Sequence, residues 1–449
     1  MKPTYDDLLE LIALLREENR QLREEVRRLQ KKVESLEERL KLNSKNSSLP
    51  PSKDQKANKQ QPKGGAKPGH QGKSRPLFPE HQISKTVTSS LDCCPHCGSH
   101  HLRYEGPVVS QQVDLPPIQP QVTQIEQQRA CCLNCHRHAI APFPPGYAQT
   151  AFGPRLTAFV GMCSAGYRLS KRSIQDLLKT GFGIDCSLGS LSSMEKRLSR
   201  GLEAPYQDLF QQVDQAKIGY IDETSFREGC KTHYVWTIAT PRATFLKVLP
   251  TRGIASLDQI RPRGHPSITI SDRYQAYVYP KHQYCLAHIR RDLEKFAARA
   301  GVDGEIGRRA LFELLEVFVA CDLEDRKTMQ QRVGYRRRRL LDILHDALAE
   351  GSKELSRFSY RLLASFKKLF LFTRYEGVGC TNNAAERALR HIVLWRKTSY
   401  GTQSEAGSRF MERSVSLWQT LRKRDQPVFT FFLQAYQSTF DASVAKPVI

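Results

Sequence analysis

The sequence predicts a multidomain protein with an α/β core that contains a helical insertion, preceded by a coiled coil, a cysteine-rich metal module and a helical segment. Three observations lead to this prediction. A heptad repeat opens the chain, two C-x-x-C pairs follow it, and two β-branched runs in the middle each end in an aspartate. The length of 449 residues also favours several folded units over a single domain.

The charge balance favours a polyanionic partner, DNA or RNA. Lys and Arg number 69 and Asp and Glu number 46, which gives a formal charge of +23. No apolar run approaches the roughly 18 residues of a membrane span, and the N-terminus does not resemble a signal peptide. We therefore expect no membrane segment and a cytoplasmic protein. The 12 cysteines are clustered, which favours reduced thiols and a metal over disulfides.

Residues 1–42 predict a parallel two-stranded coiled coil that forms a homodimer. Leucines fill the d positions, and mostly β-branched residues fill the a positions. The d residues are Leu8, Leu15, Leu22, Leu29 and Leu36, and the a residues are Ile12, Asn19, Val26, Val33 and Leu40. Asn19 would fix the register at some cost in stability. The alternative is one amphipathic helix folded onto its own domain, but about five unbroken heptads favour the dimer.

Residues 43–89 predict a basic, disordered linker. Between Lys41 and Arg75 there are nine Lys or Arg residues and one acid, Asp54, among many Pro and Gly residues. Such a stretch has no means of forming a core. It can act as a spacer, as a phosphate-contacting arm, or as both.

Residues 90–143 predict a zinc ribbon. Cys94 and Cys97 form one C-x-x-C pair, and Cys132 and Cys135 form the other. Two such pairs can complete a tetrahedral Zn²⁺ site. The alternative is a set of buried, unpaired cysteines, which a paired C-x-x-C pattern disfavours.

Two details of the ribbon stay open at this point. Cys93 and Cys131 directly precede the two pairs, so the choice of zinc-binding thiols is ambiguous. Only Cys94 and Cys132 keep the two-residue gap to the second cysteine of each pair. The alternating pattern between Val108 and Arg129 predicts short strands.

Residues 144–215 predict a helical DNA-binding segment. A turn-like stretch at 181–187 separates two helical patterns, which could form a helix-turn-helix. A plain helical bundle fits the same pattern equally well.

Two β-branched runs end in a carboxylate. Asp222 follows the run at 217–221, and Asp272 follows the run at 267–271. The residues at 232–249 between them predict a β-hairpin.

A third acid, Glu386, lies in a stretch at 381–390 that we expect to be helical. Two carboxylates at strand ends and one on a helix can converge on one sheet edge and bind Mg²⁺. Two such ions about 3.5–4 Å apart suit phosphodiester chemistry. Each acid alone also fits a turn, a cap or a solvated ion pair, so spacing leaves both interpretations open.

Motifs along most of the chain resemble those of the IS66 family of bacterial insertion-sequence transposases, in the family's order. The motifs are Asn-Ser-Lys-Asn-Ser-Ser at 43–48, Pro-Pro-Ser-Lys-Asp at 50–54, Lys-Pro-Gly-His-Gln-Gly at 67–72, the paired cysteines, Ile-Asp-Glu-Thr at 221–224, Ser-Asp-Arg-Tyr-Gln-Ala-Tyr at 271–277, Cys-Leu-Ala-His-Ile-Arg-Arg-Asp-Leu at 285–293, Thr-Asn-Asn-Ala-Ala-Glu-Arg at 381–387, Trp-Arg-Lys at 395–397, Ser-Tyr-Gly-Thr at 399–402 and Gly407. A departure is Ser225-Phe226, where the family commonly has Gly-Trp.

The resemblance implies an RNase H-like core in which Asp222, Asp272 and Glu386 are the catalytic acids of a DDE site that uses Mg²⁺ (or Mn²⁺). It also implies domain boundaries. The core would comprise 216–296 and 377–412, with a helical insertion at 297–376 and a C-terminal segment at 413–449.

Several further residues have two interpretations each. Arg387, Arg390, Arg396 and Lys397 could clamp the DNA backbone or be surface charge. Trp395 could stack on a base, but burial in the core is more frequent. The Cys285-x-x-His288 pair could add metal ligands, whereas a structural contact between core and insertion is the favoured interpretation. The arginines at 336–339 fit a solvated helix face or a phosphate-binding face.

The leading hypothesis is a DDE transposase that binds the ends of its element as double-stranded DNA and catalyses strand cleavage and transfer. The resemblance implies a nucleoid-associated bacterial protein, with accessory proteins of the same element as further partners. The alternative is a catalytically silent, dimeric, zinc-containing DNA-binding regulator. A metal-dependent nuclease without strand transfer is a third possibility.

Overall fold

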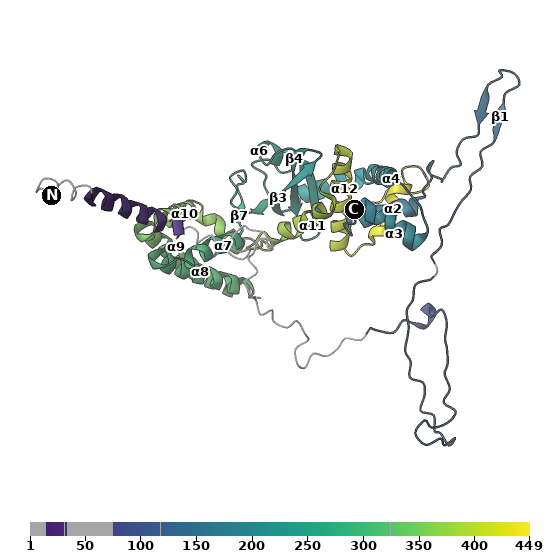
Figure 1. Cartoon of the computed structure of the whole chain (residues 1–449), viewed down its shortest axis with the longest axis horizontal. Coiled ribbons are helices and arrows are strands. Elements are labelled where there is room, and N and C mark those ends of the chain that lie inside the picture. The colour runs from purple at the N-terminus through teal and green to yellow at the C-terminus, as the bar shows by residue number, and fades with distance from the viewer. Residues whose placement is uncertain (1–14, 31, 34–74, 117, 324) are drawn as a thin grey trace, which may run out of the picture.

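A five-stranded mixed sheet forms the centre of this computed structural model, which describes residues 15–30, 32–33, 75–116, 118–323 and 325–449 (Figure 1). The strand order is β5-β4-β3-β6-β7. The strands are β3 (Ile218–Glu228), β4 (Lys231–Ala239), β5 (Thr244–Leu249), β6 (Ile268–Ser271) and β7 (His282–Tyr284). β3, β4 and β5 pair antiparallel, whereas β6 runs parallel to β3 and β7 parallel to β6. The predicted strand runs, hairpin and mixed α/β class are confirmed. The expectation that both aspartates lie at strand ends holds for Asp272, which follows β6, but is wrong for Asp222, because β3 continues past it in its pairing with β4.

Helices form two groups on either side of this sheet (Figure 1). One group is α2 (Pro154–Ala165), α3 (Lys171–Phe182), α4 (Leu188–Gly201), α5 (Glu203–Asp214), α12 (Glu405–Lys423) and α13 (Val428–Gln437). The other is α7 (Leu286–Ala297), α8 (Gly301–Cys321), α9 (Arg326–Glu350), α10 (Lys353–Ala364) and the 3₁₀ turns η3 (Phe366–Leu369) and η4 (Leu371–Thr373). Between the groups lie α6 (Ile254–Leu257) and α11 (Asn383–Ser399). The expected boundary between 412 and 413 falls inside α12.

The two faces of the sheet pack into two different hydrophobic clusters. Neighbouring residues of a strand point to opposite faces. Tyr220 accordingly packs in the cluster built mainly by α7 to α10, whereas Ile221 packs in the cluster with α5, α12 and α13. Burial on both faces fixes the register of β3, because a slip of one residue would exchange these two environments.

Helix α12 supplies hydrogen-bond acceptors to the outer strand β5. Thr420 Oγ1 accepts from Thr244 N at 3.0 Å, and Ser416 Oγ accepts from Leu246 N at 2.9 Å. Glu412 Oε2 accepts from the amide of Val248 at 2.9 Å. The acceptors lie four residues apart on one face of α12, and the donors lie two residues apart along the edge of β5. One turn of the helix therefore matches one two-residue repeat of the strand along this contact.

A tight backbone crossing joins the end of α11 to the β3–β4 turn. Thr402 N donates to Arg227 O at 2.9 Å, and Gly229 N donates to Thr402 O at 2.7 Å. Gly401 has φ +100°, and a Cβ added there would lie 2.3 Å from Arg227 O. Only glycine satisfies both the backbone angle and the close approach.

Gly401→Ala is therefore expected to lower the free energy of unfolding by about 2 kcal/mol or more, through strain and the displaced strand end. Chemical denaturation would measure the change. Gly334→Ala in α9 is the control, because an added Cβ there meets nothing within 4 Å. It should be neutral or stabilise by up to about 1 kcal/mol. Equal midpoints for Gly401→Ala and the parent chain would show that the crossing relaxes freely.

The described residues between 75 and 153 have little regular structure. They contain η2 (Glu80–Gln82) and the antiparallel pair β1 (Arg129–Cys131) and β2 (His138–Ile140). The prediction of short strands between Val108 and Arg129 is wrong for the described residues, which form none before β1. Pro116 and Pro120 lack the amide donors that a strand ladder needs.

Residues 15–30 and 32–33 are helical, and the rest of the predicted coiled coil lies outside the described residues, as do residues 43–74 of the predicted linker. Along the described helix the heptad positions Leu22, Val26 and Leu29 are 47–56% exposed in the single chain. The dimer stays a prediction. No helix in the described part of the chain combines the length and the apolar content that crossing a membrane requires.

Candidate active site

The strand register places Asp222 beside Asp272. β3 and β6 pair in parallel, with Ile218 opposite Ile268 and Tyr220 opposite Ile270. Each aspartate lies two residues beyond the last of these pairs, Asp222 inside β3 and Asp272 directly after β6. The negative charge of Asp272 acts on Asp222. Both side chains are partly buried. Backbone amides hold both carboxylates, since Glu223 N donates to Asp222 Oδ1 at 2.9 Å and Tyr274 N donates to Asp272 Oδ1 at 2.8 Å.

Asn382 positions the helix that carries Glu386. Its Nδ2 donates to Ile221 O at 2.8 Å, one residue before Asp222, and its backbone N donates to Cys285 Sγ at 3.1 Å. Asn382 is fully buried and immediately precedes α11. Glu386 lies in the first turn of that helix, where the helix dipole favours a negative charge.

The three predicted acids share one electrostatic environment. Burial is the main cause that raises the pKa of Asp222 well above its usual value. The negative charges of Glu223, Asp272 and Glu386 raise the pKa of Asp222 further. The charges of Asp272 and Glu386 thus act on Asp222. Among the described residues, however, the three carboxylates do not form a group whose ligand atoms all lie within 4.8 Å of one another.

The donor set of this cluster fits hard divalent cations. Carboxylates that repel one another are stabilised by a bound cation, and Mg²⁺ and Mn²⁺ prefer oxygen ligands. Oε1 of Glu386 is buried and has no hydrogen-bond partner among the described residues. The residues therefore fit the ions that the sequence analysis expected.

A supporting network next to the acids was not predicted. The Glu223 side chain is 2% exposed and forms an ion pair with Arg252 at 2.5 Å. Tyr277 also donates its hydroxyl to Glu223. Arg252 stacks on the ring of Tyr274, 4.2 Å from its centroid, and the amide of Tyr274 holds Asp272. Burial raises the pKa of Glu223, while the bonds from Tyr277 and Arg252 act in the opposite direction.

The predicted DNA-contacting residues of α11 differ in their surroundings. Arg387, Arg390 and Lys397 are exposed. Arg396 is partly buried, and its guanidinium donates to Thr224 Oγ1 at 3.2 Å and to the backbone of β3. Trp395 is 7% exposed and donates to Ser164 O at 3.1 Å, so its core position is confirmed.

The two cysteine pairs adopt the same local backbone. In one pair Cys94 N donates to Ser99 O at 2.9 Å and Gly98 N donates to Cys94 O at 2.8 Å. In the other pair Cys132 N donates to Arg137 O at 2.9 Å, and His136 N donates to Cys132 O at 2.8 Å. Backbone amides lower the pKa of the first cysteine in each pair. The largest effect on Cys94 comes from the amide of His96, and the largest effect on Cys132 comes from the amide of Cys135.

The two cysteine pairs are not gathered into one ligand group in the part of the chain that the structure describes. The zinc ribbon built from Cys94, Cys97, Cys132 and Cys135 stays a prediction.

The mixed sheet and its acid cluster define an α/β protein with a candidate metal-dependent active site. The chain belongs to the IS66 transposase family, because the model of that family, described as "Transposase IS66 family", matches residues 149–409, more than half of the chain. The predicted resemblance is confirmed. A second model, described as a family of unknown function (DUF6444), matches residues 2–76.

A similar curated protein is "Uncharacterized protein y4hP" of Sinorhizobium fredii (strain NBRC 101917 / NGR234). It is 25% identical over 374 residues, and the match covers 72% of this chain and 66% of the relative. The chain thus spans just under two thirds of the length of this relative.

Proposed function

We propose that this chain is a DDE transposase with an RNase H-like core, which binds the ends of its element and catalyses DNA strand cleavage and strand transfer. The observation that carries the proposal is the parallel pairing of β3 and β6, whose register ends two residues before Asp222 and Asp272, together with the effect of the Asp272 charge on Asp222. The charge of Glu386 acts on the same group. The sheet, with three antiparallel strands followed by two parallel ones, supports the RNase H-like assignment.

In the proposed mechanism, Asp222, Asp272 and Glu386 would hold the divalent cations. Mg²⁺ (or Mn²⁺), when bound, supplies activation of the attacking oxygen and stabilisation of the leaving oxygen. Asn382 and the Glu223–Arg252 pair keep the carboxylates in position. Water would first attack a phosphodiester and break its bond to the 3′-oxygen, which leaves a 3′-hydroxyl on one fragment and a 5′-phosphate on the other. This 3′-hydroxyl would then attack a target phosphodiester in line, lose its proton and expel the 3′-oxygen of the target strand as a new 3′-hydroxyl.

An in vitro assay with DNA that flanks the gene tests this proposal. Joined DNA products that depend on Mg²⁺ would support a transposase, and cleavage without joining would favour the nuclease alternative. End binding without cleavage would favour the silent regulator. Repeating that assay with cell extract would separate this regulator from a transposase that needs accessory proteins.

A basic groove beside the acids is proposed as part of the DNA path. It has a volume of about 570 Å³ and lies between α7 and α10. Its lining includes the ring of Phe358 and four cationic side chains, Arg273, Lys295, Arg357 and Arg361. Two acids, Asp292 and Glu354, also line it and pair with Arg273 and Lys295, so the cations exceed the acids by two. Arg273 directly follows Asp272. Cations beside an aromatic ring suit a nucleic acid strand. Arg387, Arg390, Arg396 and Lys397 on α11 would extend the same path.

Replacing Arg357 and Arg361 together by Gln is expected to weaken DNA binding without abolishing it. Each lost phosphate contact should reduce the slope of log affinity against log salt by about 0.9, hence by about 2 for both. Fluorescence anisotropy at several salt concentrations measures the slope. The pair Arg242→Gln and Lys446→Gln is the control, because both residues are exposed and outside the groove. An equal slope for the two double variants would remove the groove from the DNA path.

The ribbon proposal has a direct test in metal analysis. Protein purified without chelators is expected to carry about one Zn²⁺ per chain bound by Cys94, Cys97, Cys132 and Cys135. Replacing Cys97 and Cys135 by Ser should release this ion, whereas Cys230→Ser should not, because Cys230 is exposed in the β3–β4 turn. Folded protein that contains no zinc would contradict the ribbon.

A further inference from the structure

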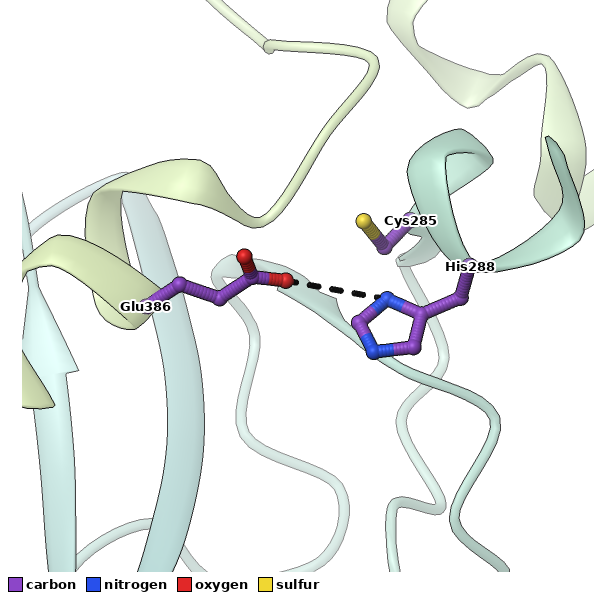
Figure 2. A group of neighbouring side chains, drawn as sticks. All are labelled: Cys285, His288 and Glu386. Atoms are coloured by element: carbon purple, nitrogen blue, oxygen red, sulfur yellow. Dashed lines mark ion pairs between the residues drawn. The ribbon is translucent and has the colours of Figure 1, made fainter. Parts of the chain in front are cut away.

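Cys285, His288 and Glu386 converge at the junction of α7 and α11 (Figure 2). One ligand atom from each, a sulfur, a nitrogen and an oxygen, lies within 4.8 Å of the other two. His288 Nδ1 is 3.8 Å from Glu386 Oε1. Cys285 is the residue that precedes α7, and His288 lies three positions further on the same helix face.

The hydrogen bonds of the protein leave this group incomplete. His288 Nδ1 and Glu386 Oε1 are buried and have no hydrogen-bond partner among the described residues. Their separation is too long for a hydrogen bond between them. A buried polar group without a partner is costly to the fold, so a bound ligand is a physical explanation for this arrangement.

We propose that Cys285, His288 and Glu386 form a binding site for a thiophilic divalent ion, Zn²⁺, which is separate from the hard-ion site but shares Glu386 with it. A thiolate, an imidazole and a carboxylate are zinc ligands, whereas Mg²⁺ prefers oxygen alone. Ligand atoms around a tetrahedral zinc lie about 3.5 Å apart for bonds of 2.0–2.3 Å. The distance between His288 and Glu386 is already near this value.

The surroundings agree with a metal that enters from solvent. The side chains of His288 and Glu386 are 29% and 39% exposed, whereas Cys285 is fully buried. Burial raises the pKa of Cys285 to about 11. The backbone amides of Asn382 and His288 act in the opposite direction, because they stabilise the thiolate. The thiol would release its proton to solvent when the ion binds.

An occupied site would inhibit strand transfer. Glu386 would then hold zinc together with Cys285 and His288 and would be withdrawn from Asp222 and Asp272. This consequence rests on the proposed function, whereas ion binding itself does not.

Titration of the full chain with Co²⁺, after its ribbon has been loaded with zinc, tests the site. The parent chain should bind one further equivalent with a thiolate-to-cobalt charge-transfer band that Zn²⁺ displaces. Cys285→Ser should lose the band, and His288→Gln should weaken Co²⁺ binding at least tenfold. Cys163→Ser is the matched control, because Cys163 is also buried and burial likewise raises its pKa to about 11. Circular dichroism would confirm that each variant is folded.

No further equivalent in the parent chain, or an unchanged band in folded Cys285→Ser, would overturn the proposal. In strand-transfer assays with saturating Mg²⁺, the inhibition constant for Zn²⁺ should be about tenfold higher for Cys285→Ser than for the parent chain. Each inhibition constant is measured relative to the zinc-free rate of the same protein. If the parent chain joins no DNA even in the presence of cell extract, the proposed function fails, and the cobalt titration still decides the metal site.

Discussion

Asp222→Asn, Asp272→Asn and Glu386→Gln are each expected to lower strand transfer by about a thousandfold or more, while end binding stays nearly intact. Each change removes a negative ligand and preserves size, so the fold and the DNA-binding surface remain. Gel-based joining assays and anisotropy on the same preparations measure the two activities. Glu305→Gln, at an exposed acid on α8, is the control and should join DNA normally. Full activity in any of the three variants would remove that residue from the site.

The same variants have an expected effect on stability in the absence of metal. The pKa of Asp222 is raised in the folded chain, so stability is lost as the pH rises from the unfolded-state pKa through the folded-state pKa. Neutral pH lies above the unfolded-state pKa of Asp222, so the raised pKa costs stability there, and Asp222→Asn should raise the thermal midpoint by about 2 °C or more. Added Mg²⁺ should stabilise the parent chain and have little effect on the variant. A lower midpoint for metal-free Asp222→Asn would contradict this account.

Replacing Leu22 and Leu29 together by Glu is expected to convert a dimer into a monomer and to abolish paired-end strand transfer. Both residues occupy d positions and are exposed in the single chain. Two charged side chains at these positions would face each other across the helix pair, where burial of leucine stabilises the dimer by several kcal/mol. Light scattering measures the mass, and a single-end binding assay should show retained binding.

The control for this change places the same side chains on the outer face of the helix. Gln21→Glu with Arg28→Glu alters two c positions, so the mass and the strand-transfer activity should remain near those of the parent chain. A parent chain that is monomeric would instead favour the amphipathic helix folded onto its own domain.

The acids could be predicted from the sequence because their signals are local. A β-branched run that ends in Asp marks each of Asp222 and Asp272, and the motif around Glu386 has the pattern of a helix start. Their convergence follows from the parallel pairing of β3 and β6. No local pattern specifies that pairing, which is why spacing alone left a plain turn or cap open for each acid.

The supporting contacts could not be predicted, because they join residues far apart in the chain. Asn382 bonds to Ile221 across 161 residues, and Arg252 reaches Glu223 across 29. Neither contact has a period or a composition signal. Asn382 and Glu223 did lie inside the recognised motifs, so the motifs identified these positions without indicating their roles. The strand pattern between Val108 and Arg129 failed for a related reason, since alternation forms a strand only where a partner strand is available.

The cover that α12 provides over β5 has a consequence for assembly. Thr420, Ser416 and Glu412 occupy the amide groups that an additional strand would need. An exposed edge of this kind is a template for pairing with other chains and for aggregation. Because α12 closes that edge, the sheet cannot be continued by a second copy on this side. If the chain forms the predicted dimer, its protomers would therefore associate through other surfaces than this edge, and α12 protects the β5 edge from edge-to-edge aggregation.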